Sequence, residues 1–268
     1  MSIKPLIPSS PPVGVSLSGH PTRTWVIPDI HGCYETLLRL IEDSIRPSSN
    51  DLLVFLGDYI DRGAQSKGVL DYLRQLERQG QAIISLLGNH EDVLLRCYDE
   101  AHNPQPMVGM MRLEDSWQRY GGDATLRSFG VRKVGDIPAD YIEWLRQRPL
   151  YYSTNDYVMV HAGMNFLIND PFSDQTAMLW AKNYPIEPHK IGYRTLIYGH
   201  RPYNLAQIQS QITQNSPSIG LDNGCIYSNE YGKGHLLAFE LHSRRLLVQP
   251  SVEQTSTPKR KVSLPAAS

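Results

Sequence analysis

Residues 52–63 have the sequence LLVFLGDYIDRG, and this stretch decides the fold. The apolar run Leu52–Leu56 predicts a short buried strand, and a polar loop, Gly57–Gly63, follows it at once. Two more apolar runs lead into polar loops in the same way, Thr24–Ile27 into Pro28–Gly32 and Ala82–Leu87 into Gly88–Glu91. A helical pattern follows each loop. This alternation predicts parallel strands joined by right-handed crossovers, with the polar loops at the carboxyl ends of the strands.

The rest of the chain has a different pattern. Residues 102–150 are predicted to be mainly helical, with a helix beginning near Pro138, and to form a cap-like insertion beside the site. Five further strands are predicted, at residues 157–160, 195–198, 219–221, 236–241 and 245–249, the last two as a hairpin. We expect a mostly antiparallel second sheet. The predicted fold class is therefore α/β of the layered α+β kind, two stacked mixed sheets flanked by helices.

The composition is that of an ordinary folded protein. The 268 residues are 41% hydrophobic and 20% charged, with a formal net charge of −1, which excludes a mostly disordered chain. Neither a nucleic acid partner nor a membrane is expected, because there is no global positive charge and no apolar run near the roughly 18 residues of a membrane span. Three scattered cysteines, Cys33, Cys97 and Cys225, predict buried thiols in a reducing compartment, so we expect a cytoplasmic protein.

The ends of the chain are predicted to lie outside the folded part. Residues 1–21 are rich in Pro, Ser and Gly and predict a flexible arm, and residues 251–268 predict a flexible tail. The folded domain is expected to span residues 22–250, with residues 102–150 as an insertion within it. A monomer is expected.

Six polar side chains lie just after predicted strands: Asp29, His31, Asp58, Asn89, His161 and His200. Each one alone is explained equally well as a turn residue or a buried histidine. Together they are unusual, because three successive strand ends carry Asp-x-His, Gly-Asp-x-x-Asp-Arg-Gly and Gly-Asn-His-Glu. Carboxylate, imidazole and amide oxygen suit Mn²⁺, which we expect first, or Fe or Zn²⁺. Two such cations can hold a bridging hydroxide and a phosphoryl group together.

These motifs resemble the metallophosphoesterases of the PPP type, with the calcineurin-like fold, and especially the small bacterial serine/threonine protein phosphatases. The matching pieces are Asp29–Gly32, Gly57–Gly63, Gly88–Glu91, His161–Gly163, Gly199-His200, Trp117 with Gly121-Gly122 and Thr125-Leu126, and Leu221–Cys225. The resemblance covers residues 24 to about 241. It implies a calcineurin-like sandwich with a dinuclear metal site at the carboxyl ends of the strands.

The resemblance also implies roles for single residues. Asp29, His31, Asp58 and His200 would be metal ligands, and Asn89 and His161 would hold the second cation, with Asp58 shared. Arg62 would hold the substrate phosphate, with Asn89 also in contact with substrate. His90 would protonate the leaving oxygen, and Asp61 would orient His90. Hydrolysis would then proceed by in-line attack of a metal-bridging hydroxide on phosphorus.

Two departures from the family pattern concern the substrate. Pro28 stands where the family usually has Gly, and we expect a local adjustment with metal binding kept. Lys182 stands where the family has a second phosphate-binding Arg, and a lysine has no bidentate fork. Arg194 or Arg201 could take over this role, and the sequence does not decide between them.

These motifs leave three functions open. The leading hypothesis is a metal-dependent phosphatase that acts on phosphoserine and phosphothreonine in proteins, or on a small phosphate ester. The same motifs also resemble symmetrical bis(5'-nucleosyl)-tetraphosphate hydrolases, which cleave a phosphoanhydride. A third hypothesis is an inactive module that binds phosphorylated partners, because a missing bidentate arginine weakens phosphate capture.

Overall fold

The computed structural model describes residues 21–103, 113–181, 184–228 and 230–253. Lys182, nearly all of the predicted arm and residues 254–268 of the predicted tail lie outside this description. At the carboxyl end the described chain continues three residues past the predicted boundary at 250. Val252 donates a backbone hydrogen bond to Thr36 Oγ1, and Glu253 accepts hydrogen bonds from the backbone N–H and hydroxyl of Thr36. These contacts attach residues 251–253 to the first helix.

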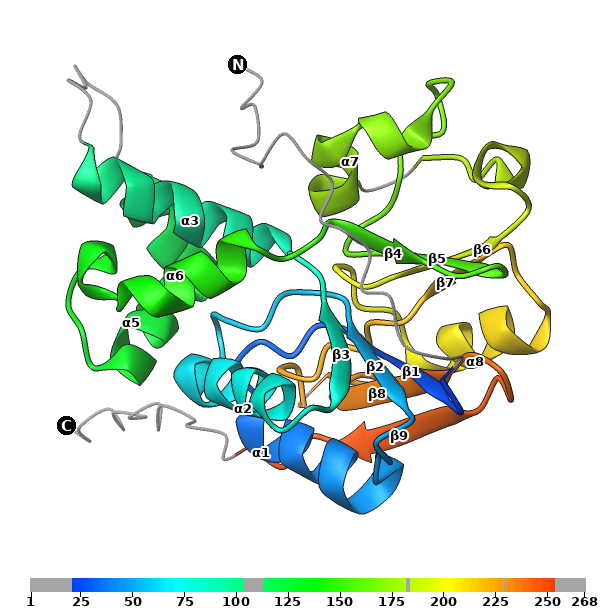
Figure 1. Ribbon diagram of the computed structural model, residues 1–268, viewed down its shortest axis with the longest axis horizontal. Helices are drawn as coiled ribbons and strands as arrows, with labels where there is room; N and C mark the ends of the chain where they lie inside the picture. The colour runs from blue at the N-terminus through cyan, green and yellow to red at the C-terminus, as the bar shows by residue number, and fades with distance from the viewer. Residues whose placement is uncertain (1–20, 104–112, 182–183, 229, 254–268) are drawn as a thin grey trace, which may run out of the picture.

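The first sheet has five strands in the order β3-β2-β1-β8-β9 (Figure 1). Its strands are β1 (Thr24–Ile27), β2 (Leu52–Phe55), β3 (Ala82–Ser85), β8 (His235–Glu240) and β9 (Leu246–Pro250). β1, β2 and β3 are parallel, as predicted, because each connection contains a crossover helix. The crossover helices are α1 (Tyr34–Leu38), which continues as a π-helical stretch (Arg39–Ile45), and α2 (Ser66–Arg78). β8 pairs antiparallel with β1 and forms the predicted hairpin with β9.

The second sheet has the order β4-β5-β6-β7, with β4 (Tyr151–Ser153), β5 (Tyr157–Val160), β6 (Thr195–Tyr198) and β7 (Ser218–Gly220). Only β4 and β5 are antiparallel, while β5, β6 and β7 are parallel. The prediction of a mostly antiparallel second sheet was therefore wrong. The connections after β5 and β6 are long enough for crossovers and contain α7 (Gln175–Trp180) and α8 (Leu205–Thr213), and the predicted hairpin belongs to the first sheet.

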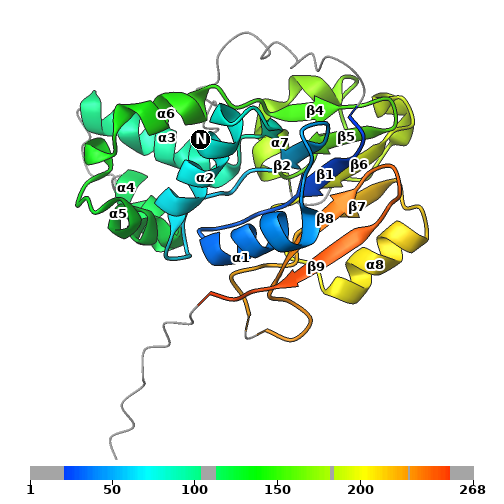
Figure 2. The same cartoon turned by 60° about the horizontal axis from the view of Figure 1, so that its bottom comes forward.

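The two sheets pack together through a shared apolar cluster (Figure 2). Val26 and Val54 of the first sheet belong to this cluster with Met159 and Ile197 of the second, and all four are fully buried. The opposite faces of the strands join a second cluster with the helices, as Phe55 does with Leu37 and Leu73. Alternate strand residues thus face the other sheet or the helices, which explains the continuous apolar run at 52–56. The prediction of two mixed sheets flanked by helices is confirmed.

A group of helices lies to one side of the sheets, at the left of Figure 1. It contains α3 (Asn89–His102), α4 (Leu113–Trp117), a π-helical stretch (Gln118–Gly122), α5 (Asp123–Phe129), a 3₁₀ turn (Val134–Asp136) and α6 (Ala139–Arg146). Pro138 caps α6, close to the predicted start. Two more 3₁₀ turns lie at Pro171–Ser173 and Pro188–Ile191. This group brings Trp117 and Gly121 to the loop that follows β2.

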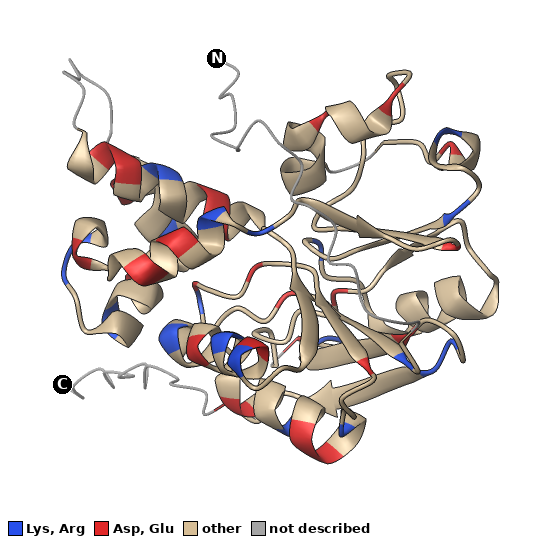
Figure 3. Cartoon of the chain, in the orientation of Figure 1, with Lys and Arg blue, Asp and Glu red and all other residues tan. Residues whose placement is uncertain are grey.

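Charged residues of both signs are interspersed on the surface helices (Figure 3). α2 and α3 each carry acidic and basic residues, including the ion pairs Lys67–Asp71 and Arg96–Asp92. Within the described ranges, no helix combines the length and the apolar character that a membrane crossing requires. The three cysteines are free and buried, as the sequence predicted.

Candidate metal centre and active site

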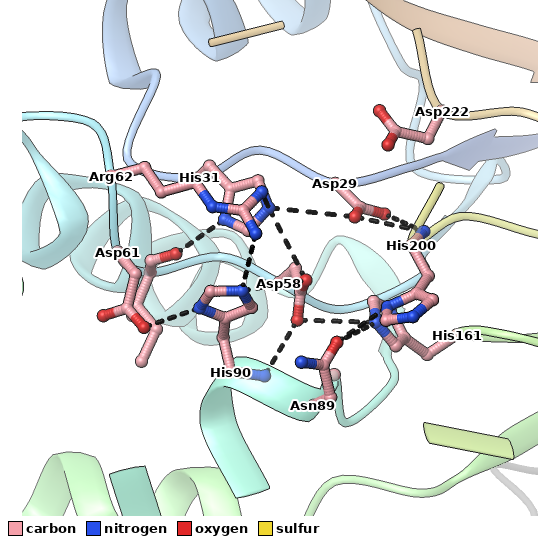
Figure 4. Close-up of polar contacts among 12 residues, drawn as sticks. Asp29, His31, Asp58, Asp61, Arg62, Asn89, His90, His161, His200 and Asp222 are labelled. Atoms are coloured by element: carbon pink, nitrogen blue, oxygen red, sulfur yellow. Dashed lines mark hydrogen bonds and ion pairs between the residues drawn. The ribbon is translucent and has the colours of Figure 1, made fainter. Parts of the chain in front are cut away.

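The side chains predicted from the strand ends meet at one edge of the two sheets (Figure 4). Asp29 and His31 follow β1, Asp58 follows β2, Asn89 follows β3, His161 follows β5 and His200 follows β6. Because these five strands are parallel within their sheets, their carboxyl ends point to the same edge. The structure therefore brings all six predicted metal ligands together.

The loops that carry these residues have unusual backbone conformations. His31, Asp58, Asp61, Arg62 and His200 all have positive φ, between 47° and 71°. A non-glycine residue in this region costs about 1 kcal/mol or more, so other contacts must hold it there. The N–H groups of Ile30 and His31 donate to the carbonyl of Asp58, and the N–H of Gly63 donates to the carbonyl of His31. The loops after β1 and β2 thus hold each other in place. These backbone hydrogen bonds form only with a fixed spacing of residues in each loop, which is why each loop appears in the sequence as a contiguous motif.

Asp58 lies at the centre of the cluster. Its Oδ2 is 3.5 Å from His31 Nε2 and its Oδ1 is 3.5 Å from His161 Nε2. Burial opposes the charged form of Asp58, but the surrounding histidines outweigh burial and lower the pKa of this carboxyl. Two groups of ligand atoms share this carboxylate, one with His31 and His90 and the other with His161 and His200. A carboxylate in this position can bridge two cations.

The histidines on either side of Asp58 are held in the form that binds metals. The ring Nδ1 of His31 donates to the carbonyl of Ile60, and that of His161 donates to the carbonyl of Leu56, both at 2.9 Å. Each Nε2 is therefore directed toward the centre with a lone pair. Burial lowers the pKa of both rings and keeps them neutral.

The donor set fits divalent cations. His161 Nε2 faces Asn89 Oδ1 at 2.9 Å, and His200 Nδ1 lies 2.8 Å from the same oxygen. The first of these contacts brings two lone pairs together, an arrangement that a shared cation stabilises. Asp29 accepts hydrogen bonds from the backbone N–H of His200, and burial together with the charges of Asp222 and Asp58 raises the pKa of Asp29. Oxygen and imidazole donors around buried carboxylates are ligands for borderline and hard metals.

The structure groups His200 differently from the prediction. Its ring lies with Asn89 and His161, whereas the resemblance grouped it with Asp29 and His31. Its contact with Asp29 is made by the backbone N–H, which donates to the carboxylate. The ligand roles of the six residues stay predictions.

Asp61 and His90 form a short buried pair beside this cluster. His90 Nδ1 lies 2.6 Å from Asp61 Oδ2, and Asp61 has no exposed surface. The indole N–H of Trp117 donates to the same carboxylate at 2.8 Å, and the hydroxyl of Thr125 donates at 2.6 Å. Burial lowers the pKa of His90, but the carboxylates of Asp58 and Asp61 outweigh burial, so its pKa is raised overall. The arrangement suits a histidine that carries a proton.

Arg62 extends over both histidine rings. Its Nη1 donates to His31 Nε2 at 2.7 Å and its Nη2 lies 3.0 Å from His90 Nε2. The backbone N–H of Arg62 donates to the carbonyl of Gly121, which has φ 107°. A Cβ atom at Gly121 would lie 2.7 Å from that nitrogen. Gly121 is therefore required for the close approach of the helical segment to Arg62, while a Cβ at Gly122 would meet the Trp117 ring instead.

A cavity of about 210 Å³ opens over these side chains. It is lined by Arg62, Asn89, His90, Val93, Trp117, Tyr120, Trp180 and His200. Tyr120 is 63% exposed and Trp180 is 37% exposed, so aromatic surface at this cavity is accessible to solvent. A phosphoryl group that enters the cavity meets a guanidinium and an imidazole at once.

Arg194 and Arg201, two of the three cations proposed as a second phosphate contact, do not line this cavity. Lys182 is not described. Arg194 donates from Nε to the carbonyl of Ile191 and lies over the ring of Phe172. Arg201 follows His200, and its backbone N–H donates to the carbonyl of Gly199. Pro28 is buried in the turn that enters Asp29, and the Asp29 carboxylate still reaches the cluster, as expected.

Two residues of the site were not among the predicted ones. Glu91 is fully buried, and its carboxylate accepts hydrogen bonds from the backbone N–H groups of Asp58, Tyr59 and Gly88. Burial and the charge of Asp58 raise the pKa of Glu91 to about 8. Its position three residues after the Gly88 helix cap was a signal for this role. Asp222 is also buried at the site, and burial raises its pKa to about 7. The sequence assigned it only to a turn.

Comparisons with known proteins agree with this geometry. The model of the calcineurin-like phosphoesterase family matches residues 22–216. The symmetrical bis(5'-nucleosyl)-tetraphosphatase of Dechloromonas aromatica is 32% identical over 143 residues, which are 53% of this chain and 44% of that protein. The chain spans about half the length of the curated relatives that it matches.

Two solved structures share the fold. One, a protein proposed to be a diadenosine tetraphosphatase, has a TM-score of 0.57 and 23% identity and covers 86% of this chain and 96% of its own. The other, a protein serine/threonine phosphatase from Saccharomyces cerevisiae, has a TM-score of 0.57 and 16% identity over 89% of this chain and 83% of its own. The resemblance drawn from the motifs is confirmed, and the chain belongs to the calcineurin-like phosphoesterase family, whose members are hydrolases of phosphate esters.

Proposed function

We propose that this protein is a metal-dependent phosphatase that removes phosphate from phosphoserine and phosphothreonine in proteins. The observation that carries the proposal is the group Asp61, His90 and Arg62, which lies at the cavity next to a set of metal-ligand side chains. The closeness of these two side chains supports a role for His90 as proton donor and for Arg62 as phosphate-binding cation. Phosphate ester hydrolysis needs both.

Each of these residues has a part in the proposed reaction. Arg62 binds the phosphate oxygens with its fork of N–H groups. His90 donates the proton from Nε2 to the leaving oxygen, and Asp61 stabilises the protonated ring from the Nδ1 side. Divalent cations held by Asp29, His31, Asp58, Asn89, His161 and His200 would supply an activated water and neutralise phosphate charge. His31 Nε2 has one lone pair, so Arg62 must leave it when a cation binds there, and Arg62 must also leave His90 Nε2 when that nitrogen carries the proton.

The size of the cavity supports a protein substrate. Pockets that enclose small molecules usually measure about 300 to 1,000 Å³, and this cavity measures about 210 Å³. Such a space accepts a phosphoryl group and the first atoms of its leaving group. A phosphorylated side chain that projects from another protein would fit a cavity of this volume.

A second candidate is the symmetrical hydrolysis of bis(5'-nucleosyl) tetraphosphates. The curated relatives with this name support it, and so do Tyr120 and Trp180 at the cavity, since exposed aromatic rings can stack on a nucleobase. An inactive module that binds phosphorylated partners is the third possibility, carried by the departure at Lys182. We further propose two cations, Mn²⁺ first with Fe or Zn²⁺ as alternatives, and a monomer in the cytoplasm.

One assay series distinguishes the three. The protein is stripped with chelator, reloaded with Mn²⁺, and given p-nitrophenyl phosphate, a phosphothreonine peptide and diadenosine tetraphosphate. We expect kcat/KM to be highest for the peptide. Nucleotide turnover far above peptide turnover would favour the second candidate, and no turnover of any substrate by Mn²⁺-loaded protein would favour the third.

Substitution of Tyr120 and Trp180 tests directly whether a nucleobase stacks at the cavity. If a base stacks on them, Tyr120→Ala and Trp180→Ala should each lower kcat/KM for diadenosine tetraphosphate about 5- to 150-fold, which corresponds to about 1–3 kcal/mol. Turnover of the small aryl phosphate should change much less. Tyr193→Ala, at an exposed tyrosine that does not line the cavity, serves as the control.

A further inference from the structure

Asp222 follows the one parallel strand among β1, β2, β3, β5, β6 and β7 that is not followed by a predicted metal ligand. In the first sheet, β1, β2 and β3 deliver Asp29, Asp58 and Asn89 just after their carboxyl ends. In the second sheet, β5 and β6 deliver His161 and His200 in the same way. The third parallel strand, β7, ends at Gly220, and Asp222 is the polar residue that follows it. Its place in the topology is equivalent to those of the other ligands.

The Asp222 carboxylate is fixed and buried. The residue is 3% exposed, its Oδ1 accepts the backbone N–H of Gly224 at 2.7 Å, and its carbonyl accepts the N–H of Tyr203. The fully buried neighbour Asn223 donates to the carbonyls of Tyr203 and Gly232 and holds the turn from both sides. Among the described residues, none donates a hydrogen bond to the second oxygen, Oδ2.

The carboxylate is turned toward the metal-ligand cluster. Figure 4 shows Asp222 on the side of the cluster where Asp29 and His200 lie. Asp222 and Asp29 repel each other electrostatically, and both are repelled by Asp58. Arg62 attracts both carboxylates and Lys233 attracts Asp222, but neither cation forms an ion pair with Asp29 or Asp222. Buried carboxylates without a paired cation are costly, and a divalent cation beside them removes this cost.

We propose that Asp222 is a further residue of the cation site, which acts on the Asp29 side by adding a third buried negative charge. It is a positioning residue: it strengthens the binding of a divalent cation held by Asp29, and it takes no part in proton transfer. The proposal rests on the metal dependence of the enzyme and not on which phosphate ester is the substrate. Its test is therefore made without substrate.

The test measures Mn²⁺ binding to the full chain by isothermal titration calorimetry, together with the melting temperature of the chelator-treated protein. Asp222→Asn keeps the acceptor for Gly224 and removes the charge. We expect Mn²⁺ to bind about 10- to 100-fold more weakly at one site, the effect typical of residues that support metal ligands. The melting temperature without metal should be unchanged or higher, because a repulsion has been removed.

A structural role for Asp222 predicts the reverse result. The metal-free protein would then melt at a lower temperature while the affinity for Mn²⁺ stayed the same, and this outcome overturns the proposal. Asp222→Glu keeps the charge and should retain affinity within a few-fold; if Asp222→Asn does not fold, Asp222→Ser replaces it, and equal affinity of the Ser and Glu variants also overturns the proposal. Glu240→Gln is the matched control, because Glu240 is a buried carboxylate that accepts backbone hydrogen bonds near the start of β1.

Discussion

The half of the site on the first sheet and the half on the second sheet are held in place by different means. Asp61, in the first half, receives hydrogen bonds from Trp117 and Thr125 and pairs with His90, all within the first sheet and its helices. In the second half, His161 is oriented by the carbonyl of Leu56 and His200 is held by Asp29, both from the first sheet. The first half supports itself, and the second depends on how the sheets stack.

Substitutions in different parts of the site should therefore have different effects. Changes at Asp61, His90 or Arg62 in the first half should disturb the proton donor or the phosphate contact while the predicted metal ligands stay in place. Changes at the point where the halves meet should release the metals. Asp58 is one such point, because its carboxylate lies 3.5 Å from one histidine of each half.

Asp58→Asn should therefore have the largest effect. Loss of the shared charge removes several kcal/mol of stabilisation of the bound cations and of phosphate charge, so activity should fall by at least about 10³-fold. Metal content, measured by mass spectrometry after dialysis, should fall with it. Asp140→Asn, at an exposed surface ion pair, should change neither. Full metal occupancy in Asp58→Asn would show that the two halves do not meet at this carboxylate.

His90→Ala tests the first half alone. It removes the proposed proton donor and none of the six predicted ligands, so kcat for a phosphopeptide should fall about 10²- to 10⁴-fold with metal content close to normal. His102→Ala, at the exposed end of the same helix α3, should leave kcat unchanged. The effect should be smaller for p-nitrophenyl phosphate, whose leaving group needs little protonation. If metal is lost together with activity, His90 is a metal ligand, which contradicts its proposed role as proton donor.

The first half was predictable from sequence, because its residues are contiguous. Asp58, Asp61 and Arg62 lie in one loop, and the backbone hydrogen bonds that hold that loop require their fixed spacing. His161, His200 and Asp222 come from separate segments, and the turn motif that contains Asp222 does not indicate that it lies near the other two. Their meeting depends on sheet topology, and the topology of the second sheet was mispredicted.

That error has a physical reason and a consequence for the site. Strand patterns do not encode whether a connection crosses over, so β5, β6 and β7 were expected to be mostly antiparallel. If β5 and β6 were antiparallel, His161 and His200 would lie at opposite edges of the sheet. The parallel arrangement brings them together. The sequence also did not show that the Arg194 side chain lies away from the cavity. Its Nε donates to the carbonyl of Ile191, and no residue pattern indicates this hydrogen bond.

Gly121→Ala tests how the helical segment supports the first half. The new Cβ would lie 2.7 Å from the backbone nitrogen of Arg62, and φ 107° is strained for alanine. Arg62 should shift from the phosphate position and lose a charge-assisted contact of about 1.5–3 kcal/mol, so kcat/KM should fall about 10-fold or more. Gly130→Ala is the control, since Gly130 also has positive φ but no atom within 4 Å of its Cβ position. Equal kinetic effects of the two would mean that strain alone, and not the contact with Arg62, matters.

The smallest effect is expected at the opposite end of the first sheet, where Asp51 lies just before β2. Its carboxylate accepts hydrogen bonds from Arg23 and from the backbone N–H of Ser48 at 2.7 Å. Burial raises the pKa of Asp51, but these partners outweigh burial and lower it overall. The stabilisation is thus complete above the ordinary carboxyl pKa of about 3.9 and is lost as pH falls through the lower pKa of the folded state.

Because Arg23 is partly exposed, Asp51→Asn should lower the free energy of unfolding by only about 1 kcal/mol at pH 7, measured by urea denaturation, and the difference should shrink toward pH 3. Mn²⁺ affinity and kcat should be unchanged, because this carboxylate lies at the amino ends of the strands. Asp123→Asn, at an exposed ion pair, should have less effect at either pH. A loss of activity in Asp51→Asn with normal stability would contradict this prediction. It would mean that a change at the amino ends of the strands alters the site at their carboxyl ends.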